Sequence, residues 1–395
     1  MRSAERPMVL SGRLFPDGSP TQIEVVDGLI QSVKSADALD EPDGTERWIV
    51  SGFFDLQVNG SMGRSFAAPQ LCIEDVEFIA RAVLKTGVTR LLPTVVSADL
   101  DVLTHQLSVI AEAMERSPLA AAMCPGIHIE GPFIHPDDGP RGAHRRQYVR
   151  DPSIADYERL QTASRGRVVM LTLAPERPGG IELIRHVSAQ GVVVGLGHHR
   201  ADAESLEEAV VAGARISTHL GNGADAMLPR LHGNYIWQQL GEDRLWASFI
   251  ADGHHLPAAA LRCMLRAKTL ARSVLVTDAN ELAGMPPGRY SHHGSEVELT
   301  ADGRITIPGT PYLAGSAASM PLLIGRAVAD AGLTLTEAVN LATRQPEAIM
   351  RNHVTGGSLE AGQPANLVEL TWRPHEATID VHRAVIGPFS AAVAC

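Results

Sequence analysis

The chain has 395 residues, a length that suits two or three domains or one large α/β barrel with additions. Apolar residues make up 45% of it and charged residues 20%, which supplies a large core and excludes a disordered chain. Lys and Arg number 34 against 45 Asp and Glu, so the formal net charge is −11 and gives no support for binding nucleic acid or an anionic membrane.

The cysteines and the N-terminal segment indicate the cellular compartment of such a chain. Cys72, Cys124, Cys263 and Cys395 are widely spaced and form no CxxC pair, so we expect reduced thiols. The N-terminal segment has no apolar stretch like that of a secretory signal, and no window approaches ~18 uninterrupted apolar residues. The sequence therefore predicts a cytoplasmic protein without a membrane span.

Both ends of the chain are typical of β-structure. Short strands are predicted at Met8–Leu14, Gln22–Val26 and Leu29–Val33, separated by turns rich in Pro, Asp and Gly. The C-terminal part shows the same pattern of short strands and turns, with strands predicted at Asn366–Leu370 and Arg383–Ile386. Neither end is large enough to hold a good core alone, so we expect the two to pair.

Between the ends, short apolar runs alternate with longer helical patterns. The runs that predict strands are Thr89–Val95, Gly126–Ile129, Val168–Leu173, Val192–Leu196, Ile216–His219, Trp246–Ile250 and Ser273–Val276. The stretches that predict helices include Ile73–Lys85, Asp101–Glu115, Gly180–Gln190, Ala203–Ala212 and Ala258–Arg266. About eight strand–helix repeats over ~300 residues favour a (β/α)8 barrel, with a doubly wound open sheet as the alternative.

The predicted fold is therefore α/β. Residues 51–353 form a (β/α)8 barrel of the TIM type. Residues 1–50 and residues 354–395 together form a small β-sandwich domain beside it.

Polar side chains stand at the ends of five predicted strands. They are His128 with Glu130, His198, His219, His255 and Asp278. The carboxyl ends of barrel strands build the active site. One such histidine is more often a packed residue, but five strand ends are hard to explain by packing. Glu and His suit Zn²⁺ or another first-row divalent ion, and a nearby Asp could act as a general base, so the pattern predicts metal-assisted hydrolysis.

The motifs SGFFDLQVNG, GIHIEGPFI, LGHHRA, STHLGN, IADGHH, LVTDA and LAGS occur in this order. Together they resemble the N-acetylglucosamine-6-phosphate deacetylases of the amidohydrolase superfamily, from Val50 to Val368. The resemblance implies a metal-dependent hydrolase that removes acetate from an N-acetylated amino sugar, first of all N-acetylglucosamine 6-phosphate, and leaves the free amine. It also implies a homodimer.

By this resemblance Glu130, His198 and His219 would be the metal ligands. Asp278 would take a proton from the attacking water and deliver one to the departing amine. His144 resembles the family histidine that polarises the amide carbonyl and stabilises the oxyanion.

Gln57 and Asn59 occupy the place where most of the superfamily carries an HxH pair. Neutral amides are poor zinc ligands, so they would be the remnant of a second metal site. The alternative is that they bind strand-end backbone. In either case we expect one divalent ion per chain, Zn²⁺ first, with Fe²⁺, Co²⁺ or Mn²⁺ as alternatives.

Four residues would contact the substrate by the same resemblance: Asn222, Gly223, His255 and Arg230, the last reaching the phosphate across the dimer. The family commonly reads THLYNAM where this chain reads THLGNGADAMLPR. This departure keeps an alternative open, in which the same chemistry acts on an unphosphorylated amino sugar, an N-acyl amino acid or a cyclic amide. A scaffold without catalysis is a third hypothesis, which the presence of all the ligands and the base disfavours.

Tandem histidines give three more candidates. We expect His199 and His254 to support their neighbours or to be solvated, because alternation along a strand turns one of each pair away. His292 and His293 lie in a turn-rich segment, for which a solvated loop is the prediction.

Overall fold

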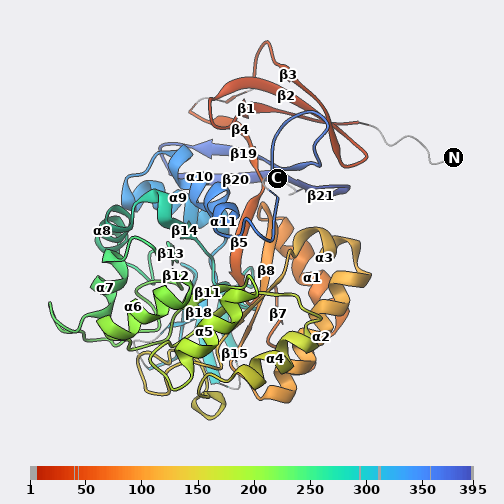
Figure 1. Cartoon of the computed structure of the whole chain (residues 1–395). Coiled ribbons are helices and arrows are strands. Elements are labelled where there is room, and N and C mark those ends of the chain that lie inside the picture. The colour runs from red at the N-terminus through yellow and green to blue at the C-terminus, as the bar shows by residue number, and fades with distance from the viewer. Residues whose placement is uncertain are drawn as a thin grey trace.

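The computed structural model describes residues 7–39, 41–42, 44–292, 295–309, 313–355 and 357–392. His293 and Cys395, about which the sequence made predictions, lie outside these ranges. Figure 1 shows a lobe of strands ringed by helices, with a β-rich lobe built from the red and blue ends of the chain above it.

The larger lobe contains an eight-stranded parallel sheet. Its strands are β5 (Phe53–Val58), β8 (Val88–Val96), β9 (Ile127–Glu130), β10 (Val168–Leu173), β11 (Val193–Leu196), β12 (Ala214–Ser217), β13 (Trp246–Phe249) and β14 (Ser273–Leu275). A parallel bridge between Val58 and Ala279 joins the first strand to the segment after the last. The sheet therefore closes on itself, which confirms the barrel and excludes the open sheet.

Helices cover the outside of the barrel (Figure 1). They are α1 (Ile73–Leu84), α2 (Leu100–Arg116), α3 (Pro118–Met123), α4 (Ile154–Ala163), α5 (Gly180–Ala189), α6 (Ala203–Ala212), α7 (Tyr235–Gly241), α8 (Ala258–Lys268), α9 (Met320–Ala331), α10 (Leu335–Ala342) and α11 (Arg344–Ile349), with 3-10 turns η1 (Arg146–Tyr148) and η2 (Leu270–Arg272). In α1 the buried residues Val76, Ile79, Ala80 and Val83 follow helical spacing. One apolar stripe per helix thus packs against the barrel wall.

The smaller lobe contains a seven-stranded sheet of order β21-β20-β19-β4-β1-β2-β3. Its strands are β1 (Met8–Leu14), β2 (Ser19–Val26), β3 (Leu29–Ser35), β4 (Glu46–Ser51), β19 (Asn366–Arg373), β20 (Thr378–Ile386) and β21 (Phe389–Ala392). β4 and β19 run antiparallel, with Val50 opposite Val368. The two chain ends therefore share one β-rich unit, as the sequence predicts, while the domain limits at 50/51 and 353/354 stay predictions.

An antiparallel sheet follows β14 and was not predicted. It consists of β15 (Gly288–His292), β16 (Ser295–Leu299), β17 (Arg304–Thr306) and β18 (Leu313–Ser316); a small hairpin, β6 (Gly60–Ser61) and β7 (Arg64–Ser65), lies near the start of the barrel. The prediction of a solvated loop is wrong for His292. The residue is 8% exposed and Nδ1 lies 2.6 Å from Oε1 of Glu281, because pairing of β15 with β16 folds the segment back.

Among the described residues, no helix is both long enough and apolar enough to cross a membrane.

Candidate active site

The predicted ligands meet at the carboxyl ends of three barrel strands. Glu130 is the last residue of β9, and His198 and His219 each stand two residues beyond β11 and β12. Both histidines have a positive φ, of 54° and 31°, as does Asp278 after β14, at 49°. Residues other than glycine rarely adopt a positive φ, and such backbone strain concentrates at functional sites.

The carboxylate of Glu130 lies between two imidazoles. Its Oε1 is 3.0 Å from Nε2 of His198 and 2.8 Å from Nε2 of His219. Burial alone would raise the pKa of Glu130, but the bonds with His198 and His219 hold it well below its usual value. One buried carboxylate oxygen therefore lies in direct contact with two ring nitrogens, which brings three potential metal-ligating atoms together.

The histidine rings are set for ligation through Nε2. Nδ1 of His198 donates to the carbonyl oxygen of Pro140 at 2.8 Å, so in the neutral ring Nε2 carries the free electron pair. Nδ1 of His219 is buried and has no hydrogen-bond partner among the described residues. This donor set of one carboxylate and two imidazoles fits a first-row divalent metal.

His144 also reaches the site. Its Nε2 lies 4.0 Å from Oε1 of Glu130, and its Nδ1 lies 2.8 Å from Oγ of Ser97. Ligand atoms of Glu130, His144 and His198 all lie within 4.8 Å of one another, so His144 forms a second triad that overlaps the predicted one. Of the two, the closer approach of His219 to Glu130 favours His219 as the third ligand.

Asp278 is held by two amides from the first barrel strand. Nε2 of Gln57 and Nδ2 of Asn59 donate to its Oδ1 at 3.0 and 2.7 Å. Burial first, and then the charge of Glu130, raise the pKa of Asp278 to about 6, against the bond from Asn59. The two amide side chains therefore bind the carboxylate, not the strand-end backbone.

His128 is not part of this cluster. It is fully buried in the barrel, with Nδ1 3.2 Å from the Leu56 carbonyl oxygen and Nε2 2.9 Å from Oγ1 of Thr172. Burial lowers its pKa to about 4, so it is a neutral core residue.

The neighbouring histidines differ from each other. His199 is buried against the ring of Tyr235, and burial lowers its pKa to about 4. His254 is half-buried, and its Nε2 lies 3.0 Å from the carbonyl oxygen of Asp302. Within the described ranges neither forms a hydrogen bond with the Glu130 cluster, and burial shows that His199 is not solvated.

The four residues predicted to contact the substrate differ in their surroundings and in their exposure. Nδ1 of His255 lies 2.6 Å from Oδ2 of Asp252, and Nδ2 of Asn222 donates to the His219 carbonyl oxygen at 3.1 Å. A Cβ at Gly223 would lie 2.5 Å from Nδ1 of His198, so only glycine fits beside that ring. Arg230 is exposed and makes no ion pair with a carboxylate of the described residues.

Two loops of the site are joined by a cation that the sequence reasoning missed. The guanidinium of Arg200 donates to Asp137 at 2.6 Å and to Asp225 at 2.5 and 2.8 Å. Tyr235 adds a hydroxyl bond to Asp225. The one feature of the sequence that could have pointed to Arg200 is its position directly after His198 and His199, at a strand end that carries a predicted ligand. Because Arg200 forms ion pairs with two carboxylates, it is not a free anion-binding group.

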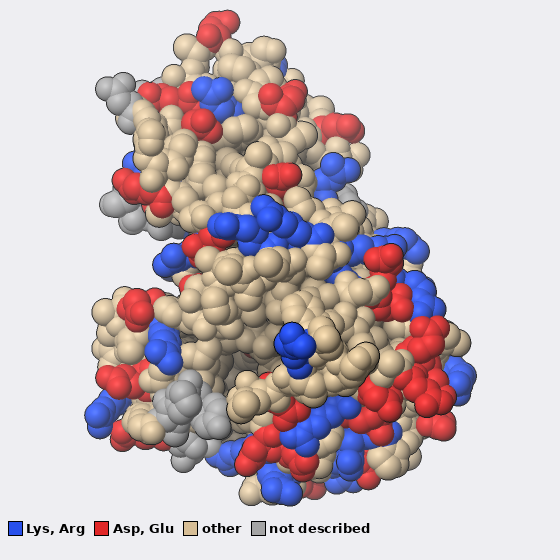
Figure 2. Space-filling model, turned by 90° about the vertical axis from the view of Figure 1, so that its left-hand side faces the viewer, with Lys and Arg blue, Asp and Glu red and all other residues tan. Residues whose placement is uncertain are grey.

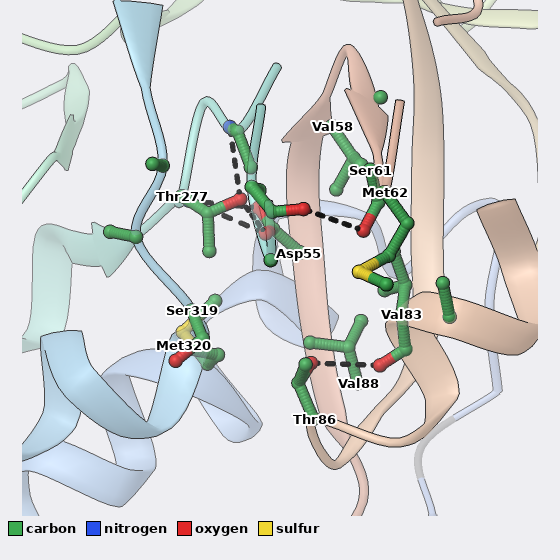
Figure 3. A pocket seen from close by; sticks show the side chains of 17 residues that line it. Asp55, Val58, Ser61, Met62, Val83, Thr86, Val88, Thr277, Ser319 and Met320 are labelled. Atoms are coloured by element: carbon green, nitrogen blue, oxygen red, sulfur yellow. Dashed lines mark hydrogen bonds between the residues drawn. The ribbon is translucent and has the colours of Figure 1, made fainter. Parts of the chain in front are cut away.

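Behind the first strand, Asp55 borders a cavity of about 130 Å³ between the barrel wall and the helices α1 and α9 (Figure 3). Its carboxylate accepts the hydroxyl of Thr277 at 2.5 Å and the Gln57 backbone N–H at 3.2 Å. Burial raises the pKa of Asp55 to about 7. Asp55 thus fixes both segments that carry Gln57 and Asp278.

Known proteins match this chain over most of its length. The amidohydrolase family model matches residues 48–389. N-acetylgalactosamine-6-phosphate deacetylase of Escherichia coli O157:H7 is 32% identical over 353 residues, 88% of this chain and 90% of that protein. N-acetylglucosamine-6-phosphate deacetylase of Homo sapiens is 35% identical over 336 residues, 82% of this chain and 80% of that protein.

A solved structure agrees. The Mycobacterium smegmatis N-acetyl-D-glucosamine-6-phosphate deacetylase, as a mutant in complex with N-acetyl-D-glucosamine-6-phosphate, has a TM-score of 0.84 and 27% identity to this chain. The match covers 98% of this chain and 100% of that one. The resemblance seen in the motifs is thereby confirmed, and the chain belongs to the amidohydrolase family.

Proposed function

We propose that this amidohydrolase is a deacetylase that hydrolyses the acetamide of an N-acetylhexosamine 6-phosphate to acetate and the free amine. The observation that carries the proposal is the convergence of Glu130, His198 and His219 beside an Asp278 held by two amides. Both relatives above act on such sugar phosphates by name.

Glu130, His198 and His219 would hold one divalent ion, with Zn²⁺ first among the candidates, and this ion would polarise the amide carbonyl and acidify the attacking water. Gln57 and Asn59 use their amide nitrogens to donate to Asp278, and neutral amide oxygens are weak ligands for a first-row divalent ion, so we propose a single ion.

Asp278 would act as the proton carrier. Since both amides bind its Oδ1, Oδ2 is the oxygen that takes the proton from water. The same carboxyl then protonates the nitrogen, because an amine departs poorly without a proton. His144, held through Nδ1 by Ser97, would present Nε2 to the carbonyl oxygen as negative charge develops there.

The phosphate requires positive charge on a chain of net charge −11. His255, close to Asp252, and the exposed Arg230 are the candidates. On the face drawn in Figure 2, Lys and Arg form a band where the two lobes meet, so the negative charge is not uniform. A surface position suits an Arg230 that serves the site of a second chain, and we propose a cytoplasmic homodimer.

The test is turnover of four substrates by the metal-loaded protein: N-acetylglucosamine 6-phosphate, N-acetylgalactosamine 6-phosphate, N-acetylglucosamine and an N-acetyl amino acid. We expect at least a hundredfold higher kcat/KM for a sugar phosphate than for the free sugar. The Escherichia coli relative makes the galacto epimer a second candidate for the preferred substrate. Equal turnover of phosphorylated and free sugar would overturn the phosphate assignment and leave the amide chemistry standing.

A further inference from the structure

A second polar cavity opens at the other end of the barrel from the site described above. It is bordered by residues that precede or begin β11, β12, β13 and β14 and by the end of α11. Its volume is about 180 Å³. None of its lining residues belongs to the Glu130 cluster, so it is a separate place on the molecule.

Three arginines from three separate segments line this cavity. Arg215 lies in β12, Arg272 directly precedes β14, and Arg351 follows α11. No carboxylate lines the cavity, and none of the three arginines forms an ion pair within the described part of the chain. Three like charges around one hollow repel each other, and an anion between them would remove that cost.

One of the arginines is held in place by an aromatic ring. The guanidinium carbon of Arg272 lies 5.3 Å from the centre of the Trp246 ring, which also lines the cavity. This contact limits the freedom of the arginine, so less entropy is lost when it binds. Asn352 and Ser188 add polar groups to the same wall.

We propose that this cavity, called the arginine pocket, binds one small phosphate-bearing anion, either inorganic phosphate or a small phosphate monoester. Guanidinium groups bind phosphate oxygens through paired N–H donors. The volume lies below the ~300–1,000 Å³ of pockets for drug-sized ligands, which favours a small anion over a nucleotide. The proposal does not depend on the reaction at the Glu130 cluster.

The test is calorimetric titration of the full chain with inorganic phosphate at constant ionic strength. The double variant Arg215→Gln/Arg351→Gln should weaken phosphate binding at least tenfold. The double variant Arg185→Gln/Arg266→Gln loses two exposed arginines outside the pocket and should bind within twofold of the unaltered protein. Equal weakening in both double variants would reduce the effect to general electrostatics and overturn the proposal.

Tryptophan fluorescence tests whether phosphate binds in the arginine pocket itself. Phosphate should change the emission of the unaltered protein, and Trp246→Phe should abolish this change while calorimetric binding persists. A fluorescence change that survives Trp246→Phe would place the anion elsewhere. If the double variant fails to fold, Arg351→Glu, in an exposed turn, gives the same test through charge reversal. A parallel titration with glycerol 3-phosphate, which is neither substrate nor product of the proposed reaction, separates the two sources, since a monoester site binds it at least as tightly as phosphate.

Discussion

Nδ2 of Asn59 lies 2.7 Å from Oδ1 of Asp278, across the seam where the barrel closes. With Gln57 at 3.0 Å, two neutral donors hold one oxygen of a buried carboxylate. The amide nitrogens of Gln57 and Asn59, which stand where most of the superfamily carries an HxH pair, thus fix the position of the Asp278 carboxylate.

Replacing Asp278 by Asn should remove most of the activity and spare the metal. Asn cannot accept the proton from water, and loss of such a group costs about 10²–10⁴-fold in rate. The metal ligands are untouched, so metal analysis should still give near one ion per chain. Turnover that stays within a few-fold of the unaltered protein would contradict the assigned role.

Gly223→Ala should weaken metal binding. The added Cβ would lie 2.5 Å from Nδ1 of His198 and push that ring from its place. Gly233→Ala is the matched control: Gly233 lies in the same loop with a similar φ of 74°, but its Cβ would meet only the Pro229 ring at 3.9 Å. We expect the Gly223 variant alone to lose metal on dialysis. Equal metal content in the two variants would show that backbone strain, and not the His198 contact, matters.

Mixed dimers test whether Arg230 acts across an interface. Arg230→Ala and Asp278→Asn should each be nearly inactive on a sugar 6-phosphate. If the two chains are co-expressed, the site of an Arg230→Ala chain receives Arg230 of the partner subunit, and activity should return to about a quarter of the unaltered level for random pairing. Absence of recovery, with dimers seen by light scattering, would place the action of Arg230 within its own chain.

Asp55→Asn should change how stability depends on pH. The pKa of Asp55 is raised from 3.8 to about 7 by burial, so between these values the folded chain holds a proton that the unfolded chain has lost. The contribution of Asp55 to the free energy of unfolding is therefore greatest below pH 4 and falls as pH rises to 7. Asn has no such dependence.

From pH 5 to pH 8 the stability of the unaltered protein, relative to the Asn variant, should fall by roughly 3 kcal/mol. Urea midpoints at the two pH values give the measurement, with the exposed Asp17→Asn as control. A difference between the two proteins that is the same at both pH values would mean that Asp55 keeps an ordinary pKa when folded.

The strands and helices of the barrel were largely predictable. The run Val168–Leu173 is β10 and Ala203–Ala212 is α6, with the predicted ends, because an apolar run and an amphipathic period each determine their own element. The hairpins from Gly288 to Ser316 were missed, since their strands are short and half polar. His292 was misplaced for the same reason.

The site was predictable only in part. The rule that strand ends meet brought Glu130, His198, His219 and Asp278 together from sequence. The partner of Asn59 was not predictable, because it lies 219 positions away and depends on how the barrel closes. The bonds of Arg200 to Asp137 and Asp225 depend likewise on loop paths, which no local pattern encodes.

The seam between β5 and the segment after β14 has a consequence for biosynthesis. Glu130, His198 and His219 are synthesised before Asp278, and the carboxylate that binds Gln57 and Asn59 is made more than two hundred residues after them. A product cut short before Asp278, by early termination or by a protease, would lack the segment that pairs with Val58, so its barrel could not close and the strand ends could not meet.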